Sequence, residues 1–475
     1  MVYSSIIFLL LLLPLVLLAY YVVPHSKKNI VALLASLLFY FWGAPKFFML
    51  LIPLLIVNFY IVQKISTSTE RLLQKKLLWL SLSINLGVLA YFKYANFFVE
   101  NVNEFLSLFG VQSFSWVEVM LPIGISFFTF QSITYSLDVY WGKHKPLKRV
   151  WDYLLYILLF PQLIAGPIIR FNTIADELND RKHNFYPDFQ LNGLYIFVLG
   201  LAKKVLIANQ IGEQVDLIFA DAAALDSGML WIGIVAYSMQ IYFDFAGYSD
   251  MAIGLGKMLG FNFPENFKNP YTATSITDFW RKWHITLGAF MRDYLYIPLG
   301  GNRSSFFFSN HINLVVVFLL SGLWHGASWN FVIWGAWHGT FLLLERLFLS
   351  RILERIPQFF QLVYSYFIVL IGWVFFRTET LSDASTYLQR MFLWTGEQEN
   401  SLQLDFKFYV FLGLALLFSY FTLFRFGKKA ELFVYSEATT WPRHIVLFSG
   451  ALVLTILSIS YVASSDFNPF IYFRF

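Results

Sequence analysis

Long apolar runs recur along the whole chain and restrict its fold more than any other feature of the sequence. They span residues 5–23, 29–44, 46–63, 77–94, 117–140, 151–169, 191–211, 228–248, 311–323, 329–349, 358–376, 406–425 and 444–463. Most approach the ~20 residues that a helix needs to cross a bilayer. Charged residues make up 13% of the chain, against about 25% in an average soluble domain. The pattern predicts an all-α, polytopic integral membrane protein with about 11–13 transmembrane or re-entrant helices.

The charges between these runs predict how the first helices cross the membrane. No basic residue precedes the first run and no A-x-A cleavage site follows it, so we expect a retained first helix rather than a cleaved signal. Lys27 and Lys28 then place the end of this helix in the cytoplasm. The basic loops 63–76 and 142–149 fall inside and the acidic loop 100–105 falls outside, in agreement with the positive-inside rule.

Composition narrows the possible chemistry. The chain has no cysteine, which excludes disulfides, thiolate metal ligands and thiol nucleophiles. The net charge of +5 comes mostly from short loops beside apolar runs, so topology explains it better than nucleic-acid binding does. Residues 254–260 are glycine-rich but follow no predicted strand, and no metal-binding histidine pattern is present, so neither a nucleotide site nor a metal is assigned. Because no repeat or low-complexity linker interrupts residues 1–475, we expect a single transmembrane domain.

Residues 240–303 break the apolar pattern. The charged or imidazole side chains that lie there among apolar and aromatic residues include Asp244, Asp250, Lys257, Glu265, Asp278, Arg281, Lys282, His284, Arg292, Asp293 and Arg303. Such groups are costly at membrane depth, where they usually face a cavity or a partner. We therefore expect a re-entrant, partly aqueous centre with breaks in the helices at 245–250 and 298–302.

The heptad DFWRKWH in this region also fits a helix that lies at the membrane surface. Asp278 would then pair with Arg281 and Lys282 one turn later, and the two tryptophans would belong to an interfacial aromatic belt. In the same way, the Arg-Asp pair of FMRDY would only hold helices together. The sequence leaves these interpretations open beside the functional one.

The stretch GLWHGASWNFVIWGAWHG (322–339) contains two Trp-His-Gly triplets, whose imidazoles can exchange a proton near neutral pH. On one continuous helix, His325 and His338 would be rotated by about 220° and would face different sides. We then expect one histidine to be chemical and the other structural. His325 follows a deep apolar run and is flanked by glycines that could open space for a substrate, so we favour His325. Packing alone could also explain either histidine, because glycines let helices approach.

Seven segments form a long ordered pattern: MVYSSIIFLLLLLPL at the start, LPIGISFFTFQSITYSLDVYWG (121–142), FPQLIAGPIIRF (160–171), FDFAGYSDMAIGLGKMLGF (243–261), DFWRKWHITLGAFMRDYLYIPLGGNR (278–303), the stretch 322–339, and NPFIYFRF at the end. In these segments the chain resembles the membrane-bound O-acyltransferase (MBOAT) family. Within that family it is most similar to the bacterial branch that acts in alginate O-acetylation. The resemblance covers nearly the whole chain.

The resemblance implies a ring of tilted helices around a thin catalytic centre. A histidine deep in the membrane core of this family matches His325, and a second polar position upstream matches His284. The resemblance further implies that acetyl-CoA enters from the cytoplasm as acyl donor and that the acceptor approaches from outside. A periplasmic acetyltransferase partner would then modify a polysaccharide such as alginate. The expected surroundings are the lipid bilayer of the cell inner membrane.

The implied reaction suits an imidazole base. The neutral ring of His325 can remove a hydroxyl proton and return it to the departing thiol, which contributes typically ~10²–10⁴ in rate. His284 could orient His325 or bind the developing oxyanion. Charge alone suggests Arg281, Lys282 or Arg292 for the phosphates of the donor. Direct transfer and relayed transfer through imidazole both stay open.

Two other functions compete with this one. A non-enzymatic transporter or polysaccharide export component would use the polar centre as a path and would tolerate replacement of His325. Transporters often consist of two similar halves, and no such symmetry is visible in the sequence. A transferase of another acyl group, such as D-alanyl, is the third possibility, and the chain resembles that branch less at its two ends.

Overall fold

The computed structural model describes residues 3–301, 309–393, 402–436, 440–465 and 467–469. Every regular element in these ranges is a helix, which confirms the predicted all-α class. The chain divides into two compact units. The first unit comprises mainly Leu10–Phe185 and Leu259–Phe263, and the second comprises Val2–Leu9, Tyr186–Met258 and Pro264–Phe475. Arg303 of the polar region 240–303 and residues 470–475 of the terminal segment NPFIYFRF lie outside the described residues.

Seven helices in the described ranges are long and apolar enough to cross a membrane. They are Pro45–Thr67, Arg71–Ser107, Pro187–Ala220, Ser227–Met258, Gln358–Arg377, Phe406–Leu423 and Trp441–Ser464. Shorter apolar helices occur at Phe8–Val22 and His311–His325. The chain is therefore a polytopic helical membrane protein, as predicted, and several of the expected apolar runs form only short helices.

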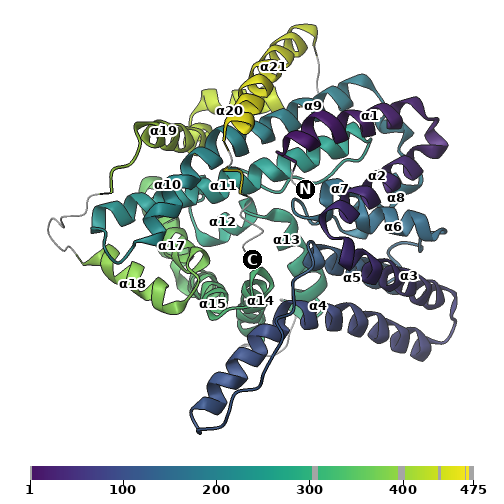
Figure 1. The fold of residues 1–475 in the computed structure, drawn as a ribbon, viewed down its shortest axis with the longest axis horizontal. Coiled ribbons are helices and arrows are strands. Elements are labelled where there is room, and N and C mark those ends of the chain that lie inside the picture. The colour runs from purple at the N-terminus through teal and green to yellow at the C-terminus, as the bar shows by residue number, and fades with distance from the viewer. Residues whose placement is uncertain (1–2, 302–308, 394–401, 437–439, 466, 470–475) are drawn as a thin grey trace. The chain divides into compact units, whose positions relative to one another are not determined.

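The first unit contains the N-terminal helices, coloured purple to blue in Figure 1. They are α1 (Leu13–Val22), α2 (Lys28–Gly43), α3 (Pro45–Thr67), α4 (Arg71–Ser107), α5 (Ile125–Tyr140), α6 (Val150–Leu158), α7 (Phe160–Leu163) and α8 (Phe171–Asn179). The predicted run 117–140 becomes helical only at the start of α5, because Gly124 has a left-handed backbone with φ of 78°. A buried network joins α3, α4 and α6: Asn58 donates to the Tyr153 hydroxyl at 2.8 Å and accepts from Ser81 at 2.7 Å.

The second unit contains most of the remaining helices. They are α9 (Pro187–Ala202), α10 (Asn209–Ala220), α11 (Ser227–Met258), α12 (Ile276–Lys282), α13 (Ile285–Met291), α14 (Ser309–His325), α15 (Trp329–Leu344), α16 (Ser350–Leu353), α17 (Gln358–Arg377), α18 (Leu381–Phe392), α19 (Phe406–Tyr420), α20 (Arg425–Tyr435) and α21 (Trp441–Ser464). The predicted break at 245–250 is wrong, since these residues lie inside the unbroken helix α11. The other predicted break is confirmed as far as Gly301: Gly300 and Gly301 have φ of 110° and 51°.

Helices α9 and α11 lie side by side (Figure 1). They pack closely because their glycines face each other. A Cβ atom at Gly200 would lie 2.5 Å from the carbonyl oxygen of Gly247, and one at Gly254 would lie 2.5 Å from that of Gly193. No larger residue fits at such separations, and small residues are a common means of bringing membrane helices together. The glycine-rich stretch 254–260 therefore contributes to helix packing.

Two ion pairs connect α11 to the π-helical segment Lys203–Ala208, which joins α9 to α10. Lys204 Nζ lies 2.6 Å from Asp244 Oδ1, and Lys203 Nζ lies 2.6 Å from Asp250 Oδ2. The first pair is buried, and Lys204 also donates to the backbone carbonyl of Pro469 near the end of the chain. Two carboxylates of the polar region are thus neutralised by partners, as charges at membrane depth require.

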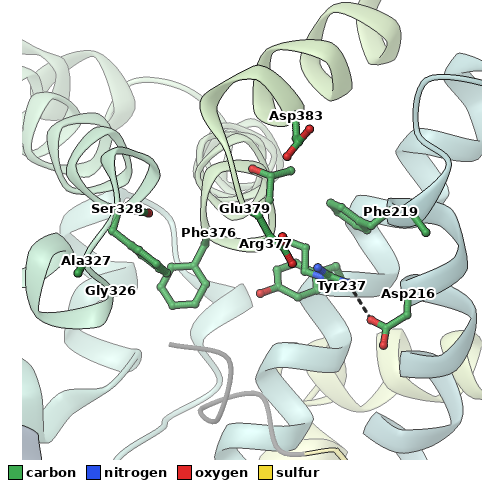
Figure 2. Close-up of a pocket in the computed structure, with 13 residues that line it drawn as sticks. Asp216, Phe219, Tyr237, Gly326, Ala327, Ser328, Phe376, Arg377, Glu379 and Asp383 are labelled. Atoms are coloured by element: carbon green, nitrogen blue, oxygen red, sulfur yellow. Dashed lines mark hydrogen bonds and ion pairs between the residues drawn. The ribbon is translucent and has the colours of Figure 1, made fainter. Parts of the chain in front are cut away.

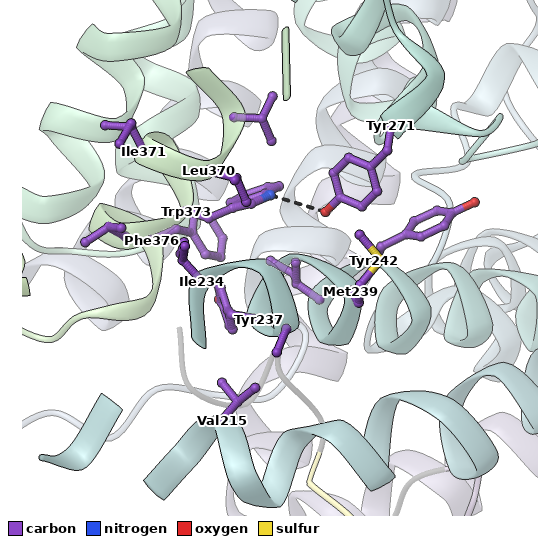
Figure 3. Packing of buried hydrophobic residues seen from close by; sticks show 14 of the residues in the cluster. Val215, Ile234, Tyr237, Met239, Tyr242, Tyr271, Leu370, Ile371, Trp373 and Phe376 are labelled. Carbon is purple, nitrogen blue, oxygen red and sulfur yellow. Dashed lines mark hydrogen bonds between the residues drawn. The ribbon is translucent and has the colours of Figure 1, made fainter. Parts of the chain in front are cut away.

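The core of the second unit is rich in aromatic side chains (Figure 3). The Tyr271 hydroxyl donates to the backbone carbonyl of Ser238 at 2.6 Å and accepts from Trp373 Nε1 at 3.3 Å. The Trp283 ring lies 4.9 Å from that of Trp373, and Trp283 is 3% exposed. Trp283 therefore belongs to this core, and the expectation of an interfacial aromatic belt is wrong for it.

Candidate active site

Helices α14 and α15 form a hairpin whose tip follows His325. Helix α14 ends at His325 and α15 begins at Trp329, so the two histidines of the Trp-His-Gly triplets do not lie on one continuous helix. A Cβ atom at Gly322 would overlap the backbone carbonyl of Phe331, and the Cβ position of Gly326 is occupied by the Phe331 ring. Gly322 and Gly326, which lie near His325 in the sequence, therefore let α14 and α15 approach closely.

His325 is surrounded by aromatic rings at the end of α14. Its ring centroid lies 4.9 Å from that of Trp324, 5.1 Å from Trp334 and 5.2 Å from Phe376. The residue is 5% exposed. A reaction at this imidazole would therefore take place largely out of contact with bulk water, where electrostatic interactions are stronger than in solution.

His284 comes from a different connection, between α12 and α13, and lies beside His325. The two ring centroids are 6.4 Å apart, and His284 is 1% exposed. Its backbone is left-handed, with φ of 46° and ψ of 51°, a conformation that costs a non-glycine residue ~1–3 kcal/mol. Its Nδ1 lies 3.1 Å from Asn266 Oδ1. The structure thus brings together the two histidines selected from the sequence.

His338 occupies the middle of α15 and is 0% exposed. Its ring centroid lies 5.0 Å from that of Trp280 and 5.1 Å from that of Trp334. A Cβ atom at Gly372 on α17 would lie 2.6 Å from His338 Nε2. Neither ring nitrogen has a hydrogen-bond partner among the residues that the structure describes. This histidine is packed between helices, with Trp334 contacting both its ring and that of His325.

The three basic residues predicted to meet the donor differ in their ion pairs. Lys282 Nζ lies 2.7 Å from Asp278 Oδ2, which confirms the predicted pair along α12. Arg292 pairs at 2.7 Å with its own neighbour Asp293, so this pair does not join two helices. Arg281 is exposed near the end of α12 and forms no ion pair with a described residue. Of the three, Arg281 is the most available to a ligand.

A buried carboxylate that the sequence analysis missed fixes the start of α12. Glu345 is 2% exposed and accepts hydrogen bonds from the backbone N–H of Ile276 at 2.7 Å and of Thr277 at 2.8 Å. The free N–H groups at a helix start favour a negative charge. Glu345 therefore orients the segment that leads to His284. The available signal was an acidic residue inside the apolar run 329–349, which is unusual in a membrane helix.

A pocket of about 910 Å³ lies beside the tip of the hairpin (Figure 2). The ends of α10 and α17 and the start of α18 line it together with residues 326–328. Arg377 donates to Asp216 at 2.8 Å, and Glu379 and Asp383 add two more carboxylates. Phe376 lines the same pocket and contacts the His325 ring, so this side chain links the pocket to the imidazole.

The pocket residues were not predicted, because Asp216 and Arg377 stand beyond the ends of apolar runs, where charges normally mark the edge of the membrane. Their pairing becomes visible only in the fold. Among the described residues, no group of three or more His, Asp or Glu side chains is arranged to hold a metal ion.

Comparison with known proteins places this site in a family. Residues 149–378 match the model of the MBOAT, membrane-bound O-acyltransferase family. The probable alginate O-acetylase AlgI of Azotobacter vinelandii is 39% identical over 473 residues, which cover 92% of this chain and 93% of that protein. The protein of the same name from Pseudomonas aeruginosa is 42% identical over 391 residues, covering 79% of this chain and 74% of the relative. The peptidoglycan O-acetyltransferase of Helicobacter pylori is 36% identical over 385 residues, covering 75% and 72%.

The region that matches the family model includes both His284 and His325, which the fold brings side by side. The relatives match over most of their length, and the seven long apolar helices in the described ranges agree with a membrane-bound family. The chain therefore belongs to the membrane-bound O-acyltransferase family and is a multi-pass membrane acyltransferase.

Proposed function

We propose that this protein transfers an acetyl group from cytoplasmic acetyl-CoA towards a polysaccharide outside the cytoplasm. The observation that carries the proposal is the approach of His284 and His325, whose rings lie 6.4 Å apart, with Phe376 contacting His325 from the lining of a pocket. The names of the relatives, alginate O-acetylase and peptidoglycan O-acetyltransferase, support acetyl as the group transferred. The acceptor is alginate or a similar polymer, and the protein acts as a single domain of residues 1–475 in the cell inner membrane.

His325 is the general base in this proposal. Its neutral imidazole takes the proton of an acceptor hydroxyl as the oxygen attacks the thioester carbonyl. The new C–O bond forms, the C–S bond breaks, and the proton passes to the departing thiolate to give the free thiol. Base assistance of this kind contributes typically ~10²–10⁴ in rate. His284 either orients the reacting groups or stabilises the oxyanion of the intermediate.

The donor side is the face that carries the basic segment 346–355 after α15. Arg346, Arg351 and Arg355 are exposed there, and basic segments beside membrane helices lie in the cytoplasm by the positive-inside rule. Arg281, Lys282 and Arg292 are the candidates for the donor phosphates. Arg281 leads them, because the other two already have carboxylate partners.

The acceptor side is the pocket at the opposite end of α17. This helix runs from the basic segment 346–355 to Arg377, so the pocket at its end faces away from the cytoplasm in this proposal. Aromatic rings with a few carboxylates are suited to sugars, since rings cover the apolar faces and carboxylates accept hydrogen bonds from hydroxyl groups. A periplasmic acetyltransferase partner would collect the acetyl group at this face and pass it to the polymer.

The test is acetyl transfer by the purified protein in liposomes with labelled acetyl-CoA. We expect label to leave CoA and to appear on an oligosaccharide or on the added periplasmic partner. A D-alanyl carrier protein supplied instead as donor should give no transfer; preferential use of it would reassign the acyl group. Export of polysaccharide without consumption of acetyl-CoA, with the partner present, would support the transporter instead.

A further inference from the structure

Asn266 contacts the turn at His284 through its backbone and its side chain. It lies between α11 and α12 and is 1% exposed. Its backbone carbonyl accepts from the N–H of Ile285 at 3.0 Å. Its side-chain Oδ1 lies 3.1 Å from His284 Nδ1, and it accepts from the hydroxyl of Thr286 at 2.8 Å. One residue therefore contacts the backbone after the strained histidine and the imidazole itself.

The orientation of the Asn266 amide is determined by its partners. The backbone N–H of Thr286 points at Oδ1 from 3.3 Å, and a backbone N–H can only donate. If the amide were rotated by half a turn, its NH₂ group would face that N–H, with two donors opposed. In the observed orientation, Nδ2 instead donates to Ser249 Oγ on α11 at 3.0 Å. The oxygen must therefore be the atom that faces His284.

This orientation fixes the proton on the histidine ring. A carbonyl oxygen can only accept, so His284 Nδ1 must carry the hydrogen in the bond to Asn266. In a neutral imidazole, the other nitrogen then holds a lone pair. Nε2 of His284 is buried and has no hydrogen-bond partner among the described residues. The ring is bordered by Phe245 on α11, Phe267 before α12, and Trp324 and His325 on α14.

We propose that Asn266 is a positioning residue that holds His284 in its Nδ1–H tautomer, so that Nε2 accepts a hydrogen bond from a neighbouring hydroxyl group of the acceptor while the reacting hydroxyl donates to His325. The proposal rests on the acyl-transfer function above. It decides between the two roles given above for His284, orienting the reacting groups or stabilising the oxyanion. The lone pair on Nε2 can accept from a hydroxyl group and so orient the acceptor, but it cannot donate to an oxyanion. The oxyanion must then be stabilised by another donor.

The tautomer can be measured without any reaction. Protonated and unprotonated imidazole nitrogens have well-separated ¹⁵N resonances, so ¹⁵N-histidine-labelled protein in liposomes reports the state of each ring, with His284→Gln used to assign the signal. We expect Nδ1–H in the wild type and in Ser249→Ala, which removes only the partner of Nδ2. Asn266→Asp should also keep Nδ1–H, since a carboxylate oxygen still accepts. Asn266→Ala should lose this single tautomer.

Activity supplies the second readout. Asn266→Ala should lower kcat between about tenfold and ~10⁴-fold, the range seen when the support or the tautomer of a functional histidine is lost, with the KM for acetyl-CoA unchanged. Asn266→Asp should restore most of kcat. Its carboxylate favours the imidazolium, so the acidic limb of its pH–rate profile should move to higher pH.

An Nε2–H tautomer in the wild type would overturn the proposal, even if Asn266→Ala fails to fold. An unchanged tautomer and unchanged kcat in folded Asn266→Ala would overturn it as well. Failure of the proposed function has a different signature: the wild type would keep the Nδ1–H tautomer and consume no acetyl-CoA.

Discussion

The two Trp-His-Gly triplets have the same sequence and different surroundings. In the first, His325 is the last residue of α14, and the residues after it line a pocket. In the second, α15 continues past His338, whose imidazole is enclosed between Trp280, Trp334 and Gly372. The difference shows that the end of a helix, rather than the local sequence, decides which imidazole lies near a cavity, since Phe376 contacts His325 and lines the pocket. Chemistry is expected at the first triplet and packing at the second.

The largest effect should come from replacing His325. In His325→Ala, acetyl transfer should fall by ~10²–10⁴, the usual contribution of a general base. The unfolding temperature in detergent should also fall, because the ring is buried among Trp324, Trp334 and Phe376. Donor turnover by purified protein, normalised to folded protein, is the measurement.

His338→Ala is the matched control for this experiment. It removes the same side chain from a fully buried position, so it should lower the unfolding temperature and keep most of kcat in the folded fraction. The contrast between the triplets would break down if the two variants exchanged these phenotypes, with His338→Ala inactive and His325→Ala active.

A smaller effect tests whether His338, in the second triplet, serves helix packing. Gly372→Ala should destabilise the protein by ~1–3 kcal/mol, the usual cost of overfilling a packed core. The added Cβ would lie 2.6 Å from His338 Nε2. In a His338→Ala background the methyl group has room, so the same substitution should cost much less there. Thermal unfolding of the four proteins in one detergent gives the coupling between the two sites.

Additive losses in that cycle would show that Gly372 does not meet the His338 ring, and the account of the second triplet would have to change. Gly413 offers a control, since a Cβ atom there would meet nothing within 4 Å. Gly413→Ala should therefore be tolerated in either background.

The membrane class could be predicted because it depends on composition, and the choice of His284 and His325, which the fold brings side by side, came from long ordered segments. Thirteen apolar runs and few charges leave a helical membrane protein as the main physical solution. The predicted break beyond Pro298 was also accessible, since the glycines that follow it favour turns. The break at 245–250 was predicted wrongly: Gly247 serves the contact with Gly200 and does not interrupt α11.

The turn at His284 could not be predicted from its neighbours. No glycine or proline stands at 283–284, and the left-handed backbone is held by hydrogen bonds that Asn266, eighteen residues away in the chain, accepts. The same holds for Glu345, whose partner N–H groups belong to α12. Interactions of this kind follow from tertiary structure, whereas local sequence fixes only the helices on either side.

The smallest expected effect concerns binding of the acyl donor rather than the chemical step. It distinguishes a binding residue, which changes KM, from His325, which changes kcat. Arg281→Ala should raise the KM for acetyl-CoA on the order of fivefold or less, because an exposed charge is screened by water and salt. Its kcat should not change, unlike that of His325→Ala. Steady-state kinetics at low and high salt would measure the effect, which should shrink as salt increases.

Arg292→Ala is the control, because its guanidinium is already paired with Asp293. We expect a smaller rise in KM for this variant than for Arg281→Ala. Equal rises in both would indicate that the donor responds to the general positive charge of this face. A larger rise in Arg292→Ala would mean that the donor phosphates displace Asp293, and the phosphate site would then lie beyond α13 rather than at the end of α12.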